Sequence, residues 1–255
     1  MNPFIMRQIK KIHGTSLEEK NDPVAAEIRL RILSDGQEII TLYCTPLMIK
    51  ELVAGLLLTE GIFTNVISSD DMSIEQDEEI RVVIRHTKNV LPDAVAFSRY
   101  LGGFSFRRKE DLRYCEDQFT LSADRLETVF REFQEKSDLF KLTGCFHSAA
   151  LSDGTKILSF AEDIGRHNAV DKVIGYALLN NISFDETILT VSCRISSEIM
   201  SKGARWKIPV IASRSAPTDL AVHIAEISGI TLIGFVRGDN LNIYTHAHRL
   251  KMSSP

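Results

Sequence analysis

The sequence lacks an apolar run long enough to cross a membrane, and it lacks a strong net charge of either sign. Its 255 residues include 30 Lys and Arg against 34 Asp and Glu, which gives a formal net charge of -4. A transmembrane helix needs about 20 consecutive apolar residues, and a near-neutral protein has no overall field that attracts polyanions. We therefore expect a protein that binds neither a membrane nor nucleic acid.

Closely spaced cysteines are also absent, because no two of the four cysteines form a C-x-x-C pair. They are Cys44, Cys115, Cys145 and Cys193. Structural zinc sites usually take their ligands from close pairs, so we expect no metal site. The N-terminal segment has no apolar core and no small-residue cleavage site of a secretory signal. The expected location is the cytoplasm, where a disulfide framework is not expected.

The N-terminal part of the chain has the pattern of a small strand and helix unit. Apolar and polar residues alternate over Glu27–Leu33 and Glu38–Cys44, on either side of the turn sequence Asp35-Gly36, which predicts a β-hairpin. An amphipathic helix follows, with Thr45 as its expected N-cap. A further strand is predicted at Glu79–His86.

From Thr143 onward, strand patterns and amphipathic helix patterns alternate along the chain. This alternation predicts an α/β (α+β) fold in which helices pack on a mixed sheet. We expect an N-terminal subdomain over residues 1–120 and a larger α/β domain over residues 121–255, which opens with a helix capped by Ser122. A mobile loop is expected near residues 102–118, where Gly102-Gly103 and a basic cluster interrupt the periodic pattern.

The segment EDIGRHNAVDK, Glu162–Lys172, is a dense polar cluster between a predicted strand and a predicted helix. Backbone N–H groups and the helix dipole attract anions at such a junction. One interpretation is a solvated helix start with internal ion pairs. The number of polar residues exceeds what capping requires, and this favours a binding site. Its expected ligand-binding residues are Asp163, Arg166, His167, Asn168 and Lys172.

Polar residues also follow the next predicted strands. Arg194 and Ser196 come after one strand, Ser213-Arg214-Ser215 after the next, and a turn follows the strand that ends near Val236. If these strands are parallel, their carboxyl ends share one edge of the sheet, where α/β proteins bind ligands. The clusters then converge on an anionic, oxygen-rich ligand such as a nucleotide or a pterin phosphate.

His147, in the segment TGCFHSA, has three interpretations: a base, a ligand-binding group or a hydrogen-bonded histidine. A zinc-dependent deaminase motif, H-x-E, would require glutamate two residues later. That position is Ala149, and the paired cysteines of such a site are missing. The sequence therefore disfavours zinc-dependent deamination of a base.

Together these stretches resemble the FdhD family, the accessory proteins needed for active formate dehydrogenase. The matching segments span most of Thr45–His246 in the family's order. They are TPLMIKELVAGLLLTEGI, TGCFHSAAL, EDIGRHNAVDKVIG, SCRISSEIMSKGA, SRSAPTDLAVHIAEISGITLIGF and VRGDNLNIYTH. The resemblance implies a C-terminal domain similar to the three-layer cytidine-deaminase fold, and it makes a homodimer a reasonable expectation.

The same resemblance implies a sulfur carrier. Its partners would be a cysteine desulfurase, which supplies the sulfur, and a formate dehydrogenase, which receives the matured cofactor. Its cargo would be the molybdenum cofactor bis(molybdopterin guanine dinucleotide), for which GDP-like nucleotides could serve as mimics. The family's cofactor-binding stretch corresponds here to Phe235, Val236, Arg237, Gly238, Asp239 and Asn240.

The sulfur-carrying motif departs from the family pattern. The family has C-x-x-C on a loop before the second domain, whereas this chain reads DLRYCEDQF with Cys115 as the sole cysteine. We hypothesise that Cys115 alone carries the persulfide, as an exposed thiol near Arg113. Nearby Glu116 and Asp117 disfavour its thiolate form, so an inert surface thiol is the alternative.

Three functions stay open on the sequence. The first is a sulfurtransferase-type carrier for maturation of the molybdenum cofactor. The second is a chaperone that binds the cofactor and its client enzyme without moving sulfur, as the missing C-x-x-C suggests. The third is a hydrolase that acts on a nucleotide, against which the missing zinc ligands count.

Overall fold

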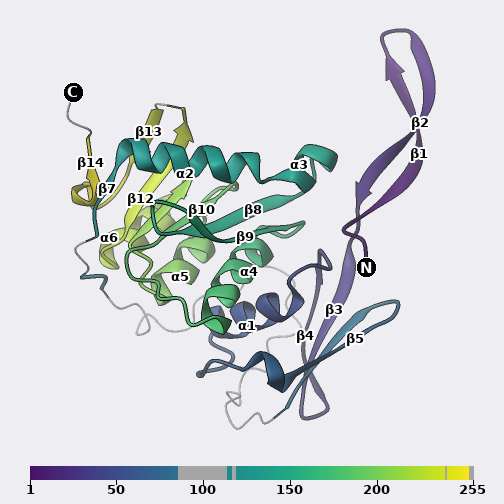
Figure 1. Ribbon diagram of the computed structural model, residues 1–255, viewed down its shortest axis with the longest axis horizontal. Helices are drawn as coiled ribbons and strands as arrows, with labels where there is room; N and C mark the ends of the chain where they lie inside the picture. Colours follow the sequence, from purple (N-terminus) through teal and green to yellow (C-terminus); the bar gives the residue numbers. More distant parts are fainter. Residues whose placement is uncertain (86–113, 117–118, 239, 253–255) are drawn as a thin grey trace.

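The computed structural model describes residues 1–85, 114–116, 119–238 and 240–252. The predicted loop near residues 102–118 lies outside the described residues except for Tyr114, Cys115 and Glu116, and Asp239 also lies outside them. The described residues form a six-stranded sheet with helices on both faces, a four-stranded sheet and a hairpin that projects from the body (Figure 1).

The six-stranded sheet is mixed and has the strand order β13-β12-β11-β10-β8-β9. Strands β10, β11 and β12 are parallel to one another, as the sequence pattern predicts. Strand β8 is antiparallel to both β10 and β9, so β9 runs in the same direction as β10. The bounds are β8 His147–Ser152, β9 Ile157–Asp163, β10 Ile188–Val191, β11 Val210–Ser213, β12 Thr231–Arg237 and β13 Asn240–Ile243.

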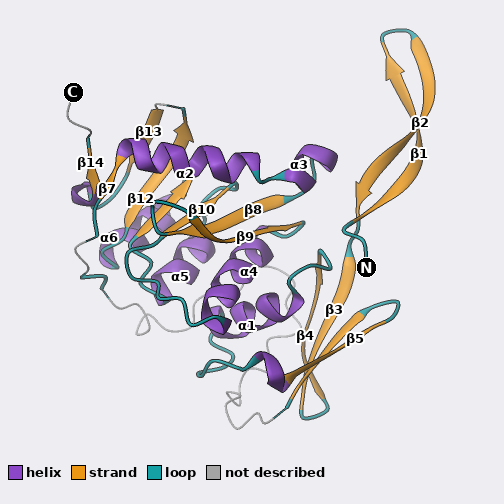
Figure 2. Cartoon of the chain, viewed as in Figure 1, coloured by secondary structure: helices purple, strands orange, loops and turns teal. Residues whose placement is uncertain are grey.

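Helices cover both faces of this sheet because its strands are apolar on both sides (Figure 2). Ile188 of β10 packs in the cluster that contains Phe130 of helix α2, whereas its neighbour Leu189 packs in the cluster that contains Val173 of helix α4. The three-layer α/β prediction is confirmed, and its likeness to cytidine deaminase stays a prediction. The helices are α2 Ala123–Glu135 on one face and α4 Arg166–Leu179, α5 Ser197–Arg205 and α6 Asp219–Ile227 on the other.

The predicted cap of α2 is confirmed, because Ser122 Oγ accepts a hydrogen bond from Arg125 N at 3.3 Å. Shorter elements complete this part of the chain. They are α3 Asp138–Thr143, η4 Ala247–Arg249 and the paired strands β7 Leu121–Ser122 and β14 Leu250–Lys251. Among the described residues, no helix combines the length and the apolarity that crossing a membrane requires.

The four-stranded sheet has the order β4-β3-β6-β5 and contains the predicted hairpin between β3 and β4. Helix α1 follows this hairpin in the chain. The expectation that Thr45 caps the helix is wrong, because the helix begins at Ile49 after Met48 and Thr45 forms a hydrogen bond with Asp163. The bounds are β3 Ile28–Ser34, β4 Gln37–Cys44, α1 Ile49–Thr59, η1 Ser69–Asp71, β5 Met72–Gln76 and β6 Ile80–Ile84.

Helices α1 and α4 cross in backbone contact. A Cβ atom placed on Gly55 would lie 1.9 Å from Asp171 O, and one placed on Gly175 would lie 1.9 Å from Glu51 O. Only glycine permits such an approach. One buried apolar cluster runs from the four-stranded sheet through both helices to the six-stranded sheet. The division at residue 120 stays a prediction, and residues on both sides of it share this core.

The projecting hairpin, which we call the arm, consists of β1 Phe4–His13 and β2 Ser16–Ala25. The sequence pattern did not predict it. Large apolar side chains of the arm are exposed rather than packed on the body. They are Ile5, Met6, Ile12, Leu17 and Val24.

Candidate functional site

The carboxyl ends of β9, β10, β11 and β12 lie along one edge of the six-stranded sheet, which we call the binding edge. The first residue of β8, His147, lies at the same edge because it pairs with Asp163 at the end of β9. Helices α4 and α5 begin there, at Arg166 and Ser197. The predicted convergence of these polar clusters on one edge is therefore confirmed.

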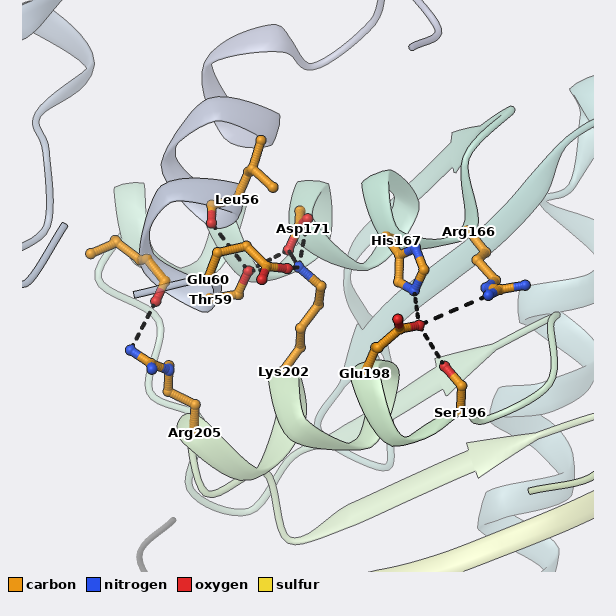
Figure 3. A network of polar contacts seen from close by, with 11 residues as sticks. Leu56, Thr59, Glu60, Arg166, His167, Asp171, Ser196, Glu198, Lys202 and Arg205 are labelled. Atoms are coloured by element: carbon orange, nitrogen blue, oxygen red, sulfur yellow. Dashed lines mark hydrogen bonds and ion pairs between the residues drawn. The ribbon is translucent and has the colours of Figure 1, made fainter. Parts of the chain in front are cut away.

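A single carboxylate joins the starts of α4 and α5 (Figure 3). Glu198 Oε2 lies 3.1 Å from His167 Nε2 and 3.9 Å from Arg166 Nη2, and it accepts a hydrogen bond from Ser196 Oγ at 3.4 Å. Arg166, His167 and Ser196 are half-buried. The donors of the two helix starts are thus held side by side and face the binding edge.

The histidines at this edge are neutral near pH 7. Burial is the largest cause that lowers the pKa of His167. The positive charges of Lys202 and Arg166 lower this pKa further, and the negative charge of Glu198 opposes them. Burial also lowers the pKa of His147, together with the charge of Arg166. A neutral imidazole offers one donor and one acceptor, so both histidines can bind a ligand by hydrogen bonds while Arg166 supplies the charge.

The loops after β10 and β11 are tied to each other. Ser213 Oγ donates to Cys193 O at 2.6 Å, and Ile195 forms an isolated parallel bridge with Pro217. Phe235 N donates to Ser215 O at 3.1 Å, and this bond attaches the end of β12 to the loop after β11. The loop that carries the exposed Arg194 therefore has a fixed path.

The predicted cofactor stretch after residue 234 contains a strained residue. Phe235 has φ of +55°, and the pairing of β12 with β13 shifts register between Gly234 and Arg237. An aromatic residue in the left-handed region is an outlier that clusters at binding sites. The Arg237 guanidinium lies 5.8 Å from the centre of the Phe235 ring. Gly238 and Asn240 are exposed, whereas Val236 packs under α2 in the core.

Three of the predicted ligand-binding residues are buried and bind one another. Lys172 and Asp163 are fully buried and lie 2.5 Å apart, between Nζ and Oδ2. Asn168 Nδ2 and Gly165 N donate to the other oxygen of Asp163 at 2.9 and 2.8 Å. Their position fits the ion-pair interpretation of the segment, because they hold the start of α4 in place and the charged pair of Lys172 and Asp163 has no exposed surface.

Thr45 connects this buried pair to the N-terminal part of the chain. Its N donates to Asp163 Oδ2 at 3.0 Å, and its O accepts from Lys172 Nζ at 3.1 Å. Its Oγ1 accepts from Ile164 N at 3.1 Å. The residue that the sequence assigned to a helix cap therefore fixes the loop that leads into the binding edge.

A second buried network lies one turn further along α4 and α5 (Figure 3). Lys202 Nζ donates to both oxygens of Asp171 at 2.9 and 3.0 Å, to Glu60 Oε1 at 2.5 Å and to Thr59 Oγ1 at 2.9 Å. Burial raises the pKa of Asp171 to about 6, although Lys202 favours its charged form. Burial opposes the charge of Lys202, but Asp171 and Glu60 outweigh it and raise its pKa. Both groups are charged at pH 7.

Cys115 does not lie at the binding edge. Its partners are Ser228 O, which accepts from its N at 2.9 Å, and Lys207 O, which accepts from its Sγ at 3.3 Å. These two residues precede β12 and β11, so Cys115 lies at the opposite edge of the sheet. Its exposed fraction is 3%. The expectation of an exposed thiol is wrong for this structure, and so is the alternative of a surface thiol.

The other cysteines differ in exposure. Burial raises the pKa of Cys44 to about 12 and that of Cys193 to about 11. Cys193 lies at the binding edge near Arg166. The charge of Arg166 lowers the pKa of this thiol, but by less than burial raises it. Cys145 is exposed. Neither buried thiol is therefore prepared for nucleophilic attack.

Two connecting residues are not among the predicted ligand-binding residues. Glu198 has a weak local signal, since it lies two residues after the predicted Ser196 cap, where an acidic residue favours a helix start. Arg249 has none: it is buried near the C-terminus and donates from Nη2 to Cys115 O at 3.2 Å.

The family model for FdhD/NarQ proteins matches residues 25–251. The chain belongs to the FdhD/NarQ family. The sequence resemblance is thus confirmed, and the matched range contains the binding edge, the two buried networks and Cys115. The arm lies before it, except for Ala25.

Relatives named "Sulfur carrier protein FdhD" match nearly the whole chain. The one from Bacillus pumilus is 36% identical over 262 residues, which covers 98% of this chain and 99% of the relative. The one from Sulfurisphaera tokodaii is 36% identical over 250 residues, with 95% and 97% covered. A crystal structure of a protein from Desulfotalea psychrophila, named for an accessory role to formate dehydrogenase, matches with a TM-score of 0.79 and 26% identity, over 97% of this chain and 99% of that one.

Proposed function

We propose that this chain is a sulfur carrier that serves a formate dehydrogenase. The observation that carries the proposal is the match, over nearly full length, to relatives named as sulfur carriers. The structure supports the proposal with a binding edge that has arginine donors and helix N-termini, to which an anionic cofactor can bind.

The binding edge suits the molybdenum cofactor bis(molybdopterin guanine dinucleotide) as the cargo. Each half of that cofactor carries phosphates, for which arginine and helix N-termini are the usual partners. The starts of α4 and α5 supply backbone N–H groups, and Arg166, Arg194 and Arg237 supply charge. The half-buried Phe235 ring offers an apolar surface on which a guanine base can stack.

The sulfur transfer balances as an exchange between a thiol and a persulfide. The Cys115 thiolate attacks the terminal sulfur of a persulfide on a cysteine desulfurase, a new S–S bond forms, and the desulfurase cysteine leaves with the electron pair of the broken bond. Release as sulfide takes two electrons. A thiol from outside the chain supplies them when it attacks the Cys115 sulfur, forms a disulfide and displaces the carried sulfur as HS⁻.

Replacement of Arg166 with Ala tests the binding edge. We expect the affinity for GDP, the mimic of the cofactor, to fall about tenfold or more, because a charged hydrogen-bond partner of a phosphate contributes about 1.5–3 kcal/mol. Isothermal titration calorimetry measures the change. Arg131→Ala on α2 removes the same charge at an exposed position away from this edge and serves as the control. Equal affinity of both variants and the parent protein for GDP would count against the site.

The arm supports a homodimer. A two-stranded hairpin is marginally stable alone in water, and Ile12 and Leu17 are paired on one face with 72% and 61% of their surfaces exposed. Lys10 and Lys11 of β1 face Glu19 and Glu18 of β2, so the arm carries a basic edge and an acidic edge that a second copy can complement.

Replacement of Ile12 and Leu17 with Glu tests this dimer. We expect the dimer dissociation constant to rise at least about tenfold, since burial of each aliphatic side chain contributes about 1.5 kcal/mol or more. Analytical ultracentrifugation measures it. Val66→Glu, at another apolar position with 51% exposure, is the control. A parent protein that is monomeric at micromolar concentration contradicts the proposed role of the arm.

A cofactor-binding chaperone without sulfur transfer is the second candidate. The observation that favours it is the burial of Cys115, together with the absence of a C-x-x-C pair. In that case the binding edge holds the cofactor for the client enzyme and Cys115 is a structural residue. Mass spectrometry of the protein after incubation with a desulfurase and cysteine separates the two, because only a carrier gains the mass of one sulfur atom.

A further inference from the structure

The contacts of Cys115 distinguish an empty carrier from a loaded one. Its backbone N donates to Ser228 O at 2.9 Å, its Sγ donates to Lys207 O at 3.3 Å, and its O accepts from Arg249 Nη2 at 3.2 Å. Two of these bonds involve the backbone of Cys115. The third depends on the chemical state of the sulfur atom.

The partner of the sulfur atom has a fixed position. Lys207 follows the C-cap residue of helix α5 with φ of +53°, and its N donates to Ala204 O at 3.0 Å. The next residue, Ile208, donates from N to Gly203 O at 3.1 Å. This is the bonding pattern of a Schellman motif, which sets the direction of the backbone at a helix end. The Lys207 carbonyl therefore cannot rotate away without breaking the helix end.

A carbonyl oxygen only accepts hydrogen bonds. The Cys115 sulfur can meet it as a thiol, which has an S–H donor. When Cys115 carries a second sulfur atom, the inner sulfur is bonded to carbon and to sulfur and has no hydrogen to donate. A thiolate also has none, and its negative charge faces the lone pairs of the carbonyl. At the position of Sγ, only the empty, protonated cysteine is complementary to the Lys207 carbonyl.

Tyr114 and Cys115 also pack closely against Gly229, which lies just before β12. A Cβ atom on Gly229 would lie 2.8 Å from the Tyr114 ring and 2.9 Å from Cys115 O. Arg249 has an exposed fraction of 2%, and its Nη1 donates to Thr231 Oγ1 at 3.2 Å, so the guanidinium that holds the segment is itself held. An additional sulfur atom on a side chain with 3% exposure requires the side chain to move.

We propose that Cys115 docking depends on loading: the empty thiol is docked against Lys207 O, and the persulfide is released from it. This inference rests on the proposed function, because Cys115 must carry the sulfur. The empty thiol leaves this dock to attack the desulfurase persulfide, and once it carries sulfur it does not return. Arg249 acts as a positioning residue, since its bond to Cys115 O does not depend on the state of the sulfur and keeps the segment at the same edge.

Two variants of similar size test the donor requirement directly. Cys115→Ser keeps a hydroxyl that can donate to Lys207 O, whereas Cys115→Ala removes the donor. Hydrogen–deuterium exchange reports docking through the amide of residue 115, which is bonded to Ser228 O. We expect the Ser variant to exchange as slowly as the parent protein and the Ala variant to exchange about tenfold faster or more. Equal exchange in both variants would overturn the donor requirement.

A chemical mimic tests the loaded state without any sulfur donor. Methyl methanethiosulfonate converts the Cys115 thiol into S–S–CH₃, which lacks the S–H donor in the same way as a persulfide. The full chain with Cys145→Ser removes the exposed thiol, and mass spectrometry selects protein modified once, at Cys115. The single tryptophan, Trp206, precedes Lys207 and reports the dock through its emission.

We expect modification to shift the Trp206 emission, to speed exchange at residue 115 by about tenfold or more, and to do so reversibly when dithiothreitol restores the thiol. Unchanged exchange and emission in the modified protein would overturn the proposal. Because no desulfurase is used, this outcome is separate from failure of sulfur transfer, which appears as missing label on Cys115.

Discussion

Replacement of Cys115 with Ser is expected to abolish the transfer of labelled sulfur from a cysteine desulfurase to this chain, with a loss of at least about 100-fold. The reason is chemical, because a thiolate attacks a persulfide sulfur and a serine hydroxyl does not do so near neutral pH. The hydroxyl keeps the donor toward Lys207 O, so the fold around the residue is preserved. The measurement is incubation with desulfurase and ³⁵S-cysteine, followed by peptide mapping under non-reducing conditions.

Cys145→Ser is the matched control, because it removes the exposed thiol with the same substitution. Its labelling should equal that of the parent protein. Cys193→Ser provides a second control at the binding edge, where burial raises the thiol pKa to about 11. Label that persists in the Cys115 variant would contradict the assignment of the carrier residue, whereas a parent protein that takes up no label would favour the chaperone.

Replacement of Lys202 with Met is expected to destabilise the fold by about 3–5 kcal/mol at pH 7. The substitution leaves two carboxylates, Asp171 and Glu60, without the ammonium group that now bonds both of them. Asp171 is fully buried, so its charge has no access to water. Chemical denaturation followed by circular dichroism measures the loss of unfolding free energy.

The pH dependence of this variant has a defined sign. Burial already raises the pKa of Asp171 to about 6 in the parent protein, and removal of Lys202 raises it further. When the pKa of a carboxyl is higher in the folded state than in the unfolded state, its ionisation at rising pH lowers the free energy of unfolding. The variant should therefore lose less stability at pH 5 than at pH 8.

Two further variants make this prediction specific. Lys136→Met, at an exposed lysine of the α2 C-terminus, should change stability by less than about 0.5 kcal/mol. Asp171→Asn added to Lys202→Met should recover part of the loss, because it removes the stranded charge. A Lys202→Met protein that is as stable as its parent at pH 8 would contradict the prediction that Asp171 and Glu60 need the ammonium group of Lys202.

The binding edge was predictable from the sequence because its signals are local. Strands that alternate with helices fix the parallel run from β10 to β12, and parallel strands bring their carboxyl ends together. Arg166, Arg194 and Arg237 each lie within three residues of a strand end. Their convergence required only the topology, which the periodic patterns of apolar residues supplied.

The interior of the polar segment was not predictable in the same way. Lysine and aspartate are rarely buried, so Lys172 and Asp163 were assigned to a ligand rather than to each other. Thr45, which bonds to both of them, is more than one hundred residues away in the chain. The same holds for Cys115, whose partners Lys207 and Arg249 are 92 and 134 residues away.

The arm escaped prediction for a different reason. Strand patterns are recognised because one face is buried, which forces apolar and polar residues to alternate. The arm has no buried face within the described monomer, so nothing imposes this period on its sequence. Its isoleucines at positions 5, 9 and 12 follow no single strand period.

The contact between Gly55 and Gly175 links the two halves of the molecule more firmly than their separate sheets suggest. Two helices whose backbones touch cannot slide or rotate past each other, and neither can gain a side chain at the crossing. A fragment that begins at residue 121 would retain α4 and the binding edge but would lose Thr45, Thr59 and Glu60, which complete both buried networks. The N-terminal unit is therefore an integral part of the structure that supports the binding edge.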